Sequence, residues 1–161
     1  MSDEKPQVTL EVRKLFVGDL SVEVPGAPEI FNEELNPEIS FNVAFENQKL
    51  PPEHFYEVKL SLTVTAKSGD KVIYLVEVAQ SGIFEIAGLE EMQLRHALNV
   101  YCTTLLYPYA REVVSSAINR AGFPSLFLQP VNFEGLFQQK LQQEAQQKTQ
   151  EAAPADPEDL N

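Results

Sequence analysis

The sequence predicts an α+β fold, because strand-like alternation fills the first half of the chain and helical periodicity fills the second. Its 161 residues are enough for one domain with a sizeable core, and no composition shift divides them into two. We expect a flexible N-terminus over residues 1–7, a folded domain over 8–144, and a disordered polar and acidic tail over 145–161.

The strand predictions depend on strict alternation of apolar and polar residues. Over residues 56–67 every second side chain is apolar, so this strand should have one buried face and one wet face. A turn at Ser68-Gly69-Asp70 joins it to a strand over 71–80. Further strands are expected at 39–46 and at about 8–17.

The strand at 71–80 is apolar on both faces. Val76 and Val78 lie on one face and Leu75 on the other, where Glu77 interrupts the apolar pattern. Such a strand needs helices over one face and a further layer, such as another subunit, over the other. Val76, Val78 and Gln80 are therefore predicted to form an oligomer interface.

Two apolar segments of the chain are not helix or strand. Residues 24–37 contain three prolines and connect two strands as a crossover that carries Phe31 and Leu35. Residues 120–133 contain Gly122 and two prolines, yet they are rich in Phe and Leu. Because loops usually run over the surface, apolar loops without catalytic residues suggest a protein that binds other chains.

The helices follow in the second half. A short helical segment should start after Gly88, and Pro108 fits the first turn of a longer helix that runs to Ala121 and is ended by Gly122. Asn132 is a plausible N-cap for a second helix at 133–141. Beyond Leu141 the chain is rich in Gln, Ala, Pro and acidic residues, so this helix should fray into the tail.

Composition limits the class of protein. Twelve basic against 24 acidic residues give a formal charge of −12, which argues against nucleic acid and anionic membranes as partners. The N-terminal residues lack the apolar run of a signal peptide, and no apolar stretch approaches a membrane span. With Cys102 as its single cysteine, the chain is expected to be cytoplasmic.

No catalytic constellation is present in the sequence. The imidazoles of His54 and His96 and the thiol of Cys102 show no metal-ligand spacing, and no phosphate-binding glycine loop occurs. A Cys-His nucleophile pair is the weaker interpretation, against a packed cysteine and a surface histidine. We therefore expect no enzymatic activity, no metal and no cofactor.

Several segments together resemble the SecB family of protein-export chaperones. They are LYPYARE at 106–112 and FPSLFLQPVNF at 123–133, with DLSVEVP at 19–25, EVAQSGIF at 77–84 and AGLE at 87–90. The likeness runs from about Leu10 to Leu141 in one order. It implies a four-stranded antiparallel sheet with a crossover connection, packed by a long helix, in a homotetramer built as a dimer of dimers.

The resemblance also implies partners. Such a chaperone holds unfolded preproteins and delivers them to the SecA motor ATPase, with no direct membrane insertion. The surface that contacts the motor is carried over to Asp19, Glu23, Leu75 and Glu77. The client groove is carried over to a set of apolar residues on the two loops, in which Leu35 stands where relatives carry Trp: Phe31, Leu35, Phe123, Leu126, Phe127 and Leu128.

Two alternatives stay open at the level of sequence. A SecB-like chaperone could serve a non-export client such as an antitoxin, with an identical fold. A small oligomeric enzyme could place a pocket in the same groove, which would require converging polar groups that the sequence does not show.

Overall fold

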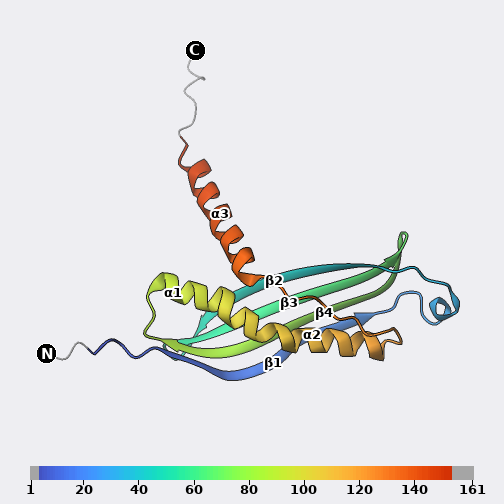
Figure 1. The fold of residues 1–161 in the computed structure, drawn as a ribbon, viewed down its shortest axis with the longest axis horizontal. Helices are drawn as coiled ribbons and strands as arrows, with labels where there is room; N and C mark the ends of the chain where they lie inside the picture. Colours follow the sequence, from blue (N-terminus) through green and yellow to red (C-terminus); the bar gives the residue numbers. More distant parts are fainter. Residues whose placement is uncertain (1–3, 154–161) are drawn as a thin grey trace, which may run out of the picture.

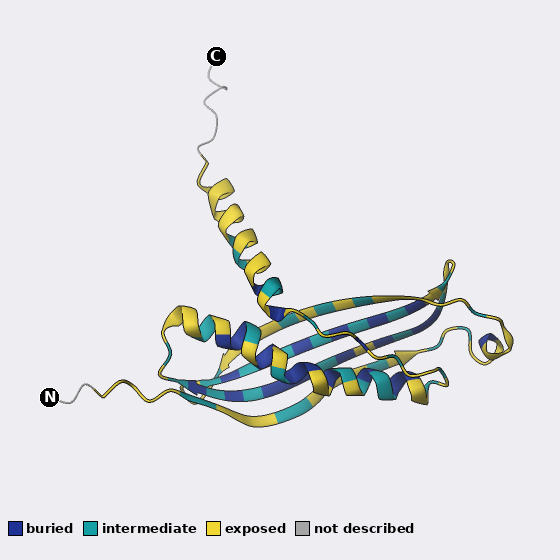
Figure 2. Ribbon diagram, viewed as in Figure 1, coloured by how far each residue is buried: buried dark blue, intermediate teal, exposed yellow. Residues whose placement is uncertain are grey.

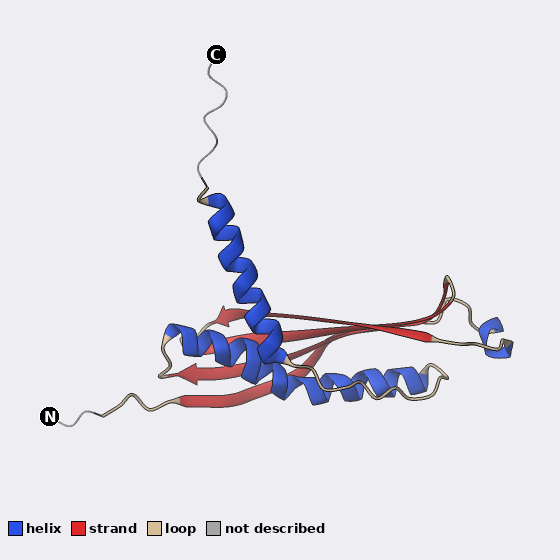
Figure 3. Cartoon of the chain, turned by 45° about the horizontal axis from the view of Figure 1, so that its top comes forward, coloured by secondary structure: helices blue, strands red, loops and turns tan. Residues whose placement is uncertain are grey.

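The computed structural model describes residues 4–153 as one sheet with helices on one of its faces (Figures 1 and 3). The four strands are antiparallel in the order β1-β4-β3-β2. The connection from β1 to β2 crosses the sheet, so the predicted α+β fold with a crossover is confirmed. The elements are β1 (Thr9–Glu23), η1 (Glu29–Asn32), β2 (Glu38–Leu50), β3 (Phe55–Ser68), β4 (Lys71–Ala87), α1 (Glu91–His96), η2 (Ala97–Tyr101), α2 (Cys102–Arg120) and α3 (Phe133–Glu151).

Two of the strands, β1 and β4, extend beyond their predicted ends. Strand β1 continues to Glu23 instead of ending near Val17, and β4 continues to Ala87 instead of ending at Gln80. Gly82 therefore lies inside β4, where the sequence predicted a strand end. A Cβ atom at Gly82 would lie 2.6 Å from Phe84 and 3.2 Å from Leu106 of α2. The glycine thus lets the helix approach the sheet closely.

Helix α2 is the second half of one continuous helical run that begins at α1. A capping box between Glu90 and Gln93 starts the run, and the π-helical turn η2 joins α1 to α2. Pro108 lies inside α2, so its predicted place in a first turn is wrong. Proline there removes the N–H that would bond the carbonyl of Thr104. Because Pro108 and Thr104 are both exposed, water can satisfy that carbonyl.

The core lies between α2 and the inner faces of β3 and β4 (Figure 2). Val76, Val78 and Gln80 belong to this inner face and are only 0%, 2% and 3% exposed within a single chain. They therefore offer no surface to a second subunit, which corrects the prediction that they contact one directly. The sequence pattern showed a face that must be covered, and the chain's own helix covers it.

Helix α3 points away from the sheet (Figure 1). Its predicted N-cap is confirmed, because Oδ1 of Asn132 accepts a hydrogen bond of 3.0 Å from the backbone N–H of Gly135. The helix continues to Glu151 instead of fraying after Leu141, since its Gln, Glu, Lys and Ala residues favour helix without packing. Residues 145–151 are thus helical rather than a disordered tail, and residues 154–161 of that tail lie outside the described part. No helix within residues 4–153 is both long and apolar enough to cross a membrane.

Candidate functional site

The crossover and the α2–α3 connection meet at an aromatic cluster. The rings of Phe31 and Phe123 are stacked, with centroids 5.3 Å apart and planes at 30°. The ring of Tyr74, on β4, has its centroid 5.0 Å from that of Phe123. Gly122 just before Phe123 has a φ of +96°, and a Cβ atom there would lie 3.0 Å from the ring of Phe31. The glycine therefore allows both the turn and the stacking of the two loops.

An ion pair fixes the crossover beside this cluster. Nζ of Lys71, the first residue of β4, lies 2.8 Å from both carboxylate oxygens of Glu33. Ile30 is fully buried, so it anchors the η1 turn in the core. Phe31 lies between these two attachments and is 50% exposed. The crossover is thus an ordered loop that presents one aromatic ring to the surface.

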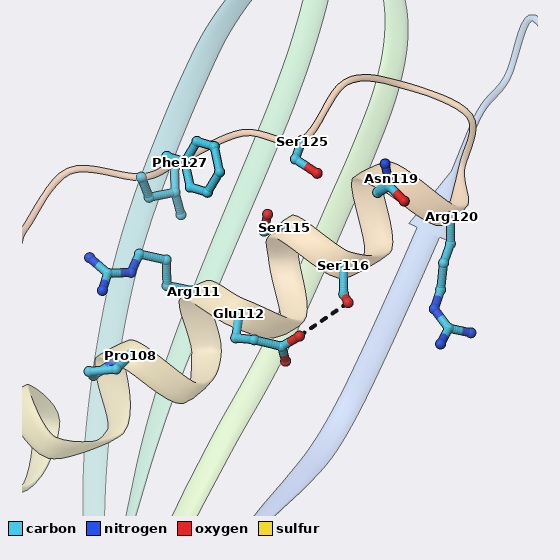
Figure 4. A pocket seen from close by; sticks show the side chains of 10 residues that line it. Pro108, Arg111, Glu112, Ser115, Ser116, Asn119, Arg120, Ser125 and Phe127 are labelled. Carbon is cyan, nitrogen blue, oxygen red and sulfur yellow. Dashed lines mark hydrogen bonds between the residues drawn. The ribbon is translucent and has the colours of Figure 1, made fainter.

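Phe127 occupies a different surface from Phe31. It is 81% exposed, more than any other large apolar side chain in residues 4–153. It lies beside a hollow of about 760 Å³ between α2 and the connection (Figure 4). The hollow has a polar wall on α2, where Oγ of Ser116 donates to Glu112 at 3.1 Å. The residues that line it are Pro108, Arg111, Glu112, Ser115, Ser116, Asn119, Arg120, Ser125, Phe127 and Leu128.

The remaining predicted client residues are more buried than Phe127. Leu128, which the resemblance places in the client groove, is 8% exposed and belongs to the core, so it can contribute only to the floor of the hollow. Leu35 and Leu126 are half-buried and pack against the core. The structure therefore brings Phe31 and Phe123 into contact, and separates them from the hollow beside Phe127.

A second hollow was not predicted from the sequence. It has about 580 Å³ and lies between β2 and the end of the α2–α3 connection, with Phe41, Val43, Val131 and Leu136 among its lining residues. The alternation in this strand predicts one apolar face, but it does not say whether that face is covered. The signal for exposure is that β2 ends up at the edge of the sheet, where α2 does not reach.

The four predicted motor-contact residues lie together on the sheet face opposite α2. Cross-strand partners share a face, and Asp19 pairs with Ala79, Ser21 with Glu77, and Glu23 with Leu75. Residues 75, 77 and 79 alternate with the buried Val76 and Val78 that face the helix. Asp19, Glu23 and Glu77 are exposed, and Leu75 is half-buried among them. We call these four residues the acidic patch.

Comparison with known proteins decides the family. Residues 3–144 match the family described as Preprotein translocase subunit SecB. A protein-export protein SecB of Dichelobacter nodosus is 67% identical over 144 residues, which are 88% of this chain and 92% of the relative. One of Chromobacterium violaceum is 46% identical and covers 91% of this chain and 97% of its own. The chain belongs to the SecB family. Its function is that of a SecB-type chaperone in protein export.

Among solved structures, a SecB-like chaperone of Mycobacterium tuberculosis in complex with a ChAD peptide from the HigA1 antitoxin has the same fold. Its TM-score is 0.57 at 19% identity, over 76% of this chain and 88% of that one. At this identity the likeness concerns the fold. Since the export-named SecB relatives are far more similar in sequence, the antitoxin-client alternative is not favoured.

This SecB chain leaves an apolar strip uncovered on β1. Val12, Val17, Leu20 and Val22 are 40%, 44%, 47% and 41% exposed. In register they pair with Phe84, Gln80, Val78 and Val76, so they share the inner face of the sheet, next to α2. A contiguous exposed apolar surface of this kind marks an interaction site. These four residues are called the β1 strip below.

The candidate nucleophile pair of the sequence is not assembled in this SecB chain. Cys102 is fully buried, and burial raises the pKa of its thiol to about 12, so no thiolate forms at neutral pH. His96 is instead hydrogen-bonded to Glu134. The described residues contain no group of three metal-ligating side chains. Cys102 is thus a core thiol, and His96 is engaged with α3.

Proposed function

We propose that the chain holds unfolded preproteins on its exposed loop surface and passes them to the SecA motor ATPase. The observation that carries the client role is Phe127, a phenylalanine held 81% exposed beside a hollow of about 760 Å³. Burying such a ring against an unfolded chain is worth on the order of 1–3 kcal/mol. A folded client hides its own apolar residues, so binding selects the unfolded state and delays folding.

The client surface extends over both faces of the α2–α3 connection. Phe127 and Leu128 border the hollow on α2, and Phe41 and Val43 border the hollow on β2. Phe31 and Phe123 close the end toward the crossover. An extended client segment can thus contact several shallow apolar sites in succession, each weak by itself.

The acidic patch is the proposed contact with the motor. Its three carboxylates lie on the sheet face opposite the helices, away from the client surface. A basic partner surface would be attracted by Asp19, Glu23 and Glu77, and Leu75 offers an apolar contact among them. Because the two surfaces lie on opposite faces, client and motor can be bound together.

The working form is proposed to be a cytoplasmic homotetramer, a dimer of dimers. The β1 strip supports this assembly, since its apolar side chains lie at the edge of the sheet and remain 40–47% exposed in a single chain. A second copy that packs on the strip would bury them. Several client surfaces on one assembly then add avidity for a long unfolded chain.

One experiment tests the proposal as a whole. A slow-folding precursor is diluted from denaturant with and without the chaperone, and SecA is then added to the complex. We expect the chaperone to suppress refolding at near-stoichiometric concentration and to form a ternary complex with SecA. Unchanged refolding would refute the client role, and capture of the precursor without SecA binding would refute the motor role alone.

A further inference from the structure

The η1 turn holds a phenylalanine, Phe31, at a half-exposed position. Phe31 follows the buried Ile30 and precedes the polar Asn32 and Glu33. It is 50% exposed to solvent. Its ring stacks on that of Phe123, with 5.3 Å between centroids, and lies against Gly122. Phe31 thus covers an apolar ring without entering the core itself.

Phe31 covers a surface formed by two aromatic rings and a glycine. Phe123 supplies one ring, Tyr74 supplies a second at 5.0 Å, and Gly122 leaves room because it has no side chain. Tyr74 is only 5% exposed, so its ring forms a buried floor to this surface. We call Tyr74, Gly122 and Phe123 the ring site.

The attachment of Phe31 over the ring site is weak. Glu33 and Lys71 hold the backbone two residues after Phe31, but their side chains are 43% and 46% exposed. Exposed ion pairs contribute little, because water and salt screen them. On the other side the turn is anchored by Ile30 in the core. The segment is therefore anchored in the core at Ile30 and held at Glu33 by an exposed ion pair, so the stacking of Phe31 between them is open to competition from another ring.

We propose that Phe31 is an internal competitor for the ring site, and that an aromatic side chain of an unfolded client displaces it. The Glu33–Lys71 ion pair sets the strength of this competition. This inference rests on the proposed client role and assigns one of its contacts to a ring of the client. Phe31 itself demonstrates the chemistry of the occupant, since a phenylalanine already fills the site.

The consequence is a selective, salt-sensitive preference. A client segment with a Phe at the matching position gains the stacking that Phe31 gives up, whereas a segment with Leu there gains less because an aliphatic chain cannot stack. Weakening the ion pair should favour the displaced state of Phe31. Apparent affinity for the aromatic client rises when the binding-competent state becomes more populated.

The test uses the full chain and two labelled unstructured peptides that are identical except for one residue, Phe in one and Leu in the other. Lys71→Met and, independently, Glu33→Gln should tighten binding of the Phe peptide about two- to fivefold, the range of an exposed ion pair. Binding of the Leu peptide should not change. Lys59→Met is the matched control, because it removes another exposed pair, to Glu46 at 3.2 Å.

A double-mutant cycle identifies Phe31 as the group that acts. Phe31→Ala alone should tighten binding of the Phe peptide, and Lys71→Met should add nothing in that background. Hydrogen exchange at residues 29–33 should become faster when the Phe peptide binds. Three outcomes would refute the role of Phe31 as a competitor. They are weaker binding by Phe31→Ala, equal effects on both peptides, and an effect of Lys71→Met that persists in the Phe31→Ala background.

The client surface and the competing role of Phe31 can be refuted separately. If the wild-type chain binds neither peptide, the client surface itself is wrong, and this inference falls with it. If the wild type binds and Phe127→Gln weakens binding, the client surface is supported. If Lys71→Met and Glu33→Gln then leave the affinity for the Phe peptide unchanged, only the competing role of Phe31 is refuted. Thermal unfolding of each variant shows that the changes in affinity do not come from a loss of fold.

Discussion

Nε2 of His96 lies 2.5 Å from Oε2 of Glu134, and this contact ties α3 to α1. A second tie follows along the same helix, where Nη2 of Arg95 lies 3.0 Å from Oε2 of Glu144. Between them Phe137 is buried, with its ring 6.0 Å from that of His96. The first half of α3 is therefore docked, and Leu136 within it helps to line the hollow beside β2.

The docking of α3 should weaken in acid. The hydrogen bond from His96 lowers the pKa of Glu134 below its ordinary value of 4.5, and the hydrogen bond from Arg95 lowers that of Glu144. A carboxyl group with a lowered pKa in the folded state contributes stability above pH 4.5, which is lost as the pH falls through its folded value. Hydrogen exchange of residues 133–144 should therefore become faster below pH 4.5.

Glu134→Gln with Glu144→Gln provides the control for this pH effect. The double variant should already exchange faster at pH 7, and its exchange should show a smaller additional change in acid after correction for the intrinsic rate. The side chains of Glu134 and Glu144 are 50% and 42% exposed, so water screens both contacts, and we expect a local effect on α3 with little change in the global unfolding temperature. Identical pH profiles for the variant and the wild type would show that other groups dock the helix.

Assembly should depend on the β1 strip and not directly on the strand beneath α2. Leu20→Arg places a charge on a side chain that is 47% exposed, so the subunit should fold while sedimentation shifts from tetramer toward dimer or the 18.1 kDa monomer. Val76→Arg instead places the charge at a fully buried position. It should destabilise the fold itself by about 3–5 kcal/mol. If Val76→Arg stays folded but dissociates, β4 and not the β1 strip forms the subunit interface.

The difference between these two positions shows where the sequence was informative. Alternation in β3 and β4 correctly predicted strands, and the apolar side of Val76 and Val78 correctly predicted a covered face. It did not say whether a helix of the same chain or a second subunit covers it, because both present apolar side chains. Only the packing of α2 across β4 and β3 resolves the choice.

The loops show the same limit. Phe31, Phe127 and Leu128 are similarly apolar residues of two connections between longer elements, yet they are 50%, 81% and 8% exposed. Irregular segments have no periodicity from which a face can be derived. The acidic patch was easier, because period-two alternation along β1 and β4 fixes which carboxylates share a face, and the family resemblance had already selected them.

Charge reversal in the acidic patch should weaken binding to SecA. Asp19→Lys with Glu77→Lys replaces attraction by repulsion at an exposed surface, so affinity at low salt should fall by at least about tenfold. The remaining affinity should respond less to added salt. Glu46→Lys with Glu53→Lys makes the same change in net charge away from the patch and should bind nearly as the wild type. Equal losses in both variants, measured by titration, would indicate a general charge effect and not a site.

Client binding should depend on Phe127, whereas its neighbour Leu128 should matter mainly for the stability of the fold. Phe127→Gln removes an exposed ring, so thermal stability should be nearly unchanged while the client dissociates faster, by up to about tenfold for a loss near 1.4 kcal/mol. Tetramer mass and SecA binding should persist. Leu128→Gln places an amide at a position only 8% exposed and should lower the free energy of unfolding by about 1–3 kcal/mol. Stopped-flow dissociation of an unfolded precursor together with thermal unfolding distinguishes the two effects. If Phe127→Gln unfolds the subunit or releases the precursor at the wild-type rate, the exposed ring is not the contact that holds the client.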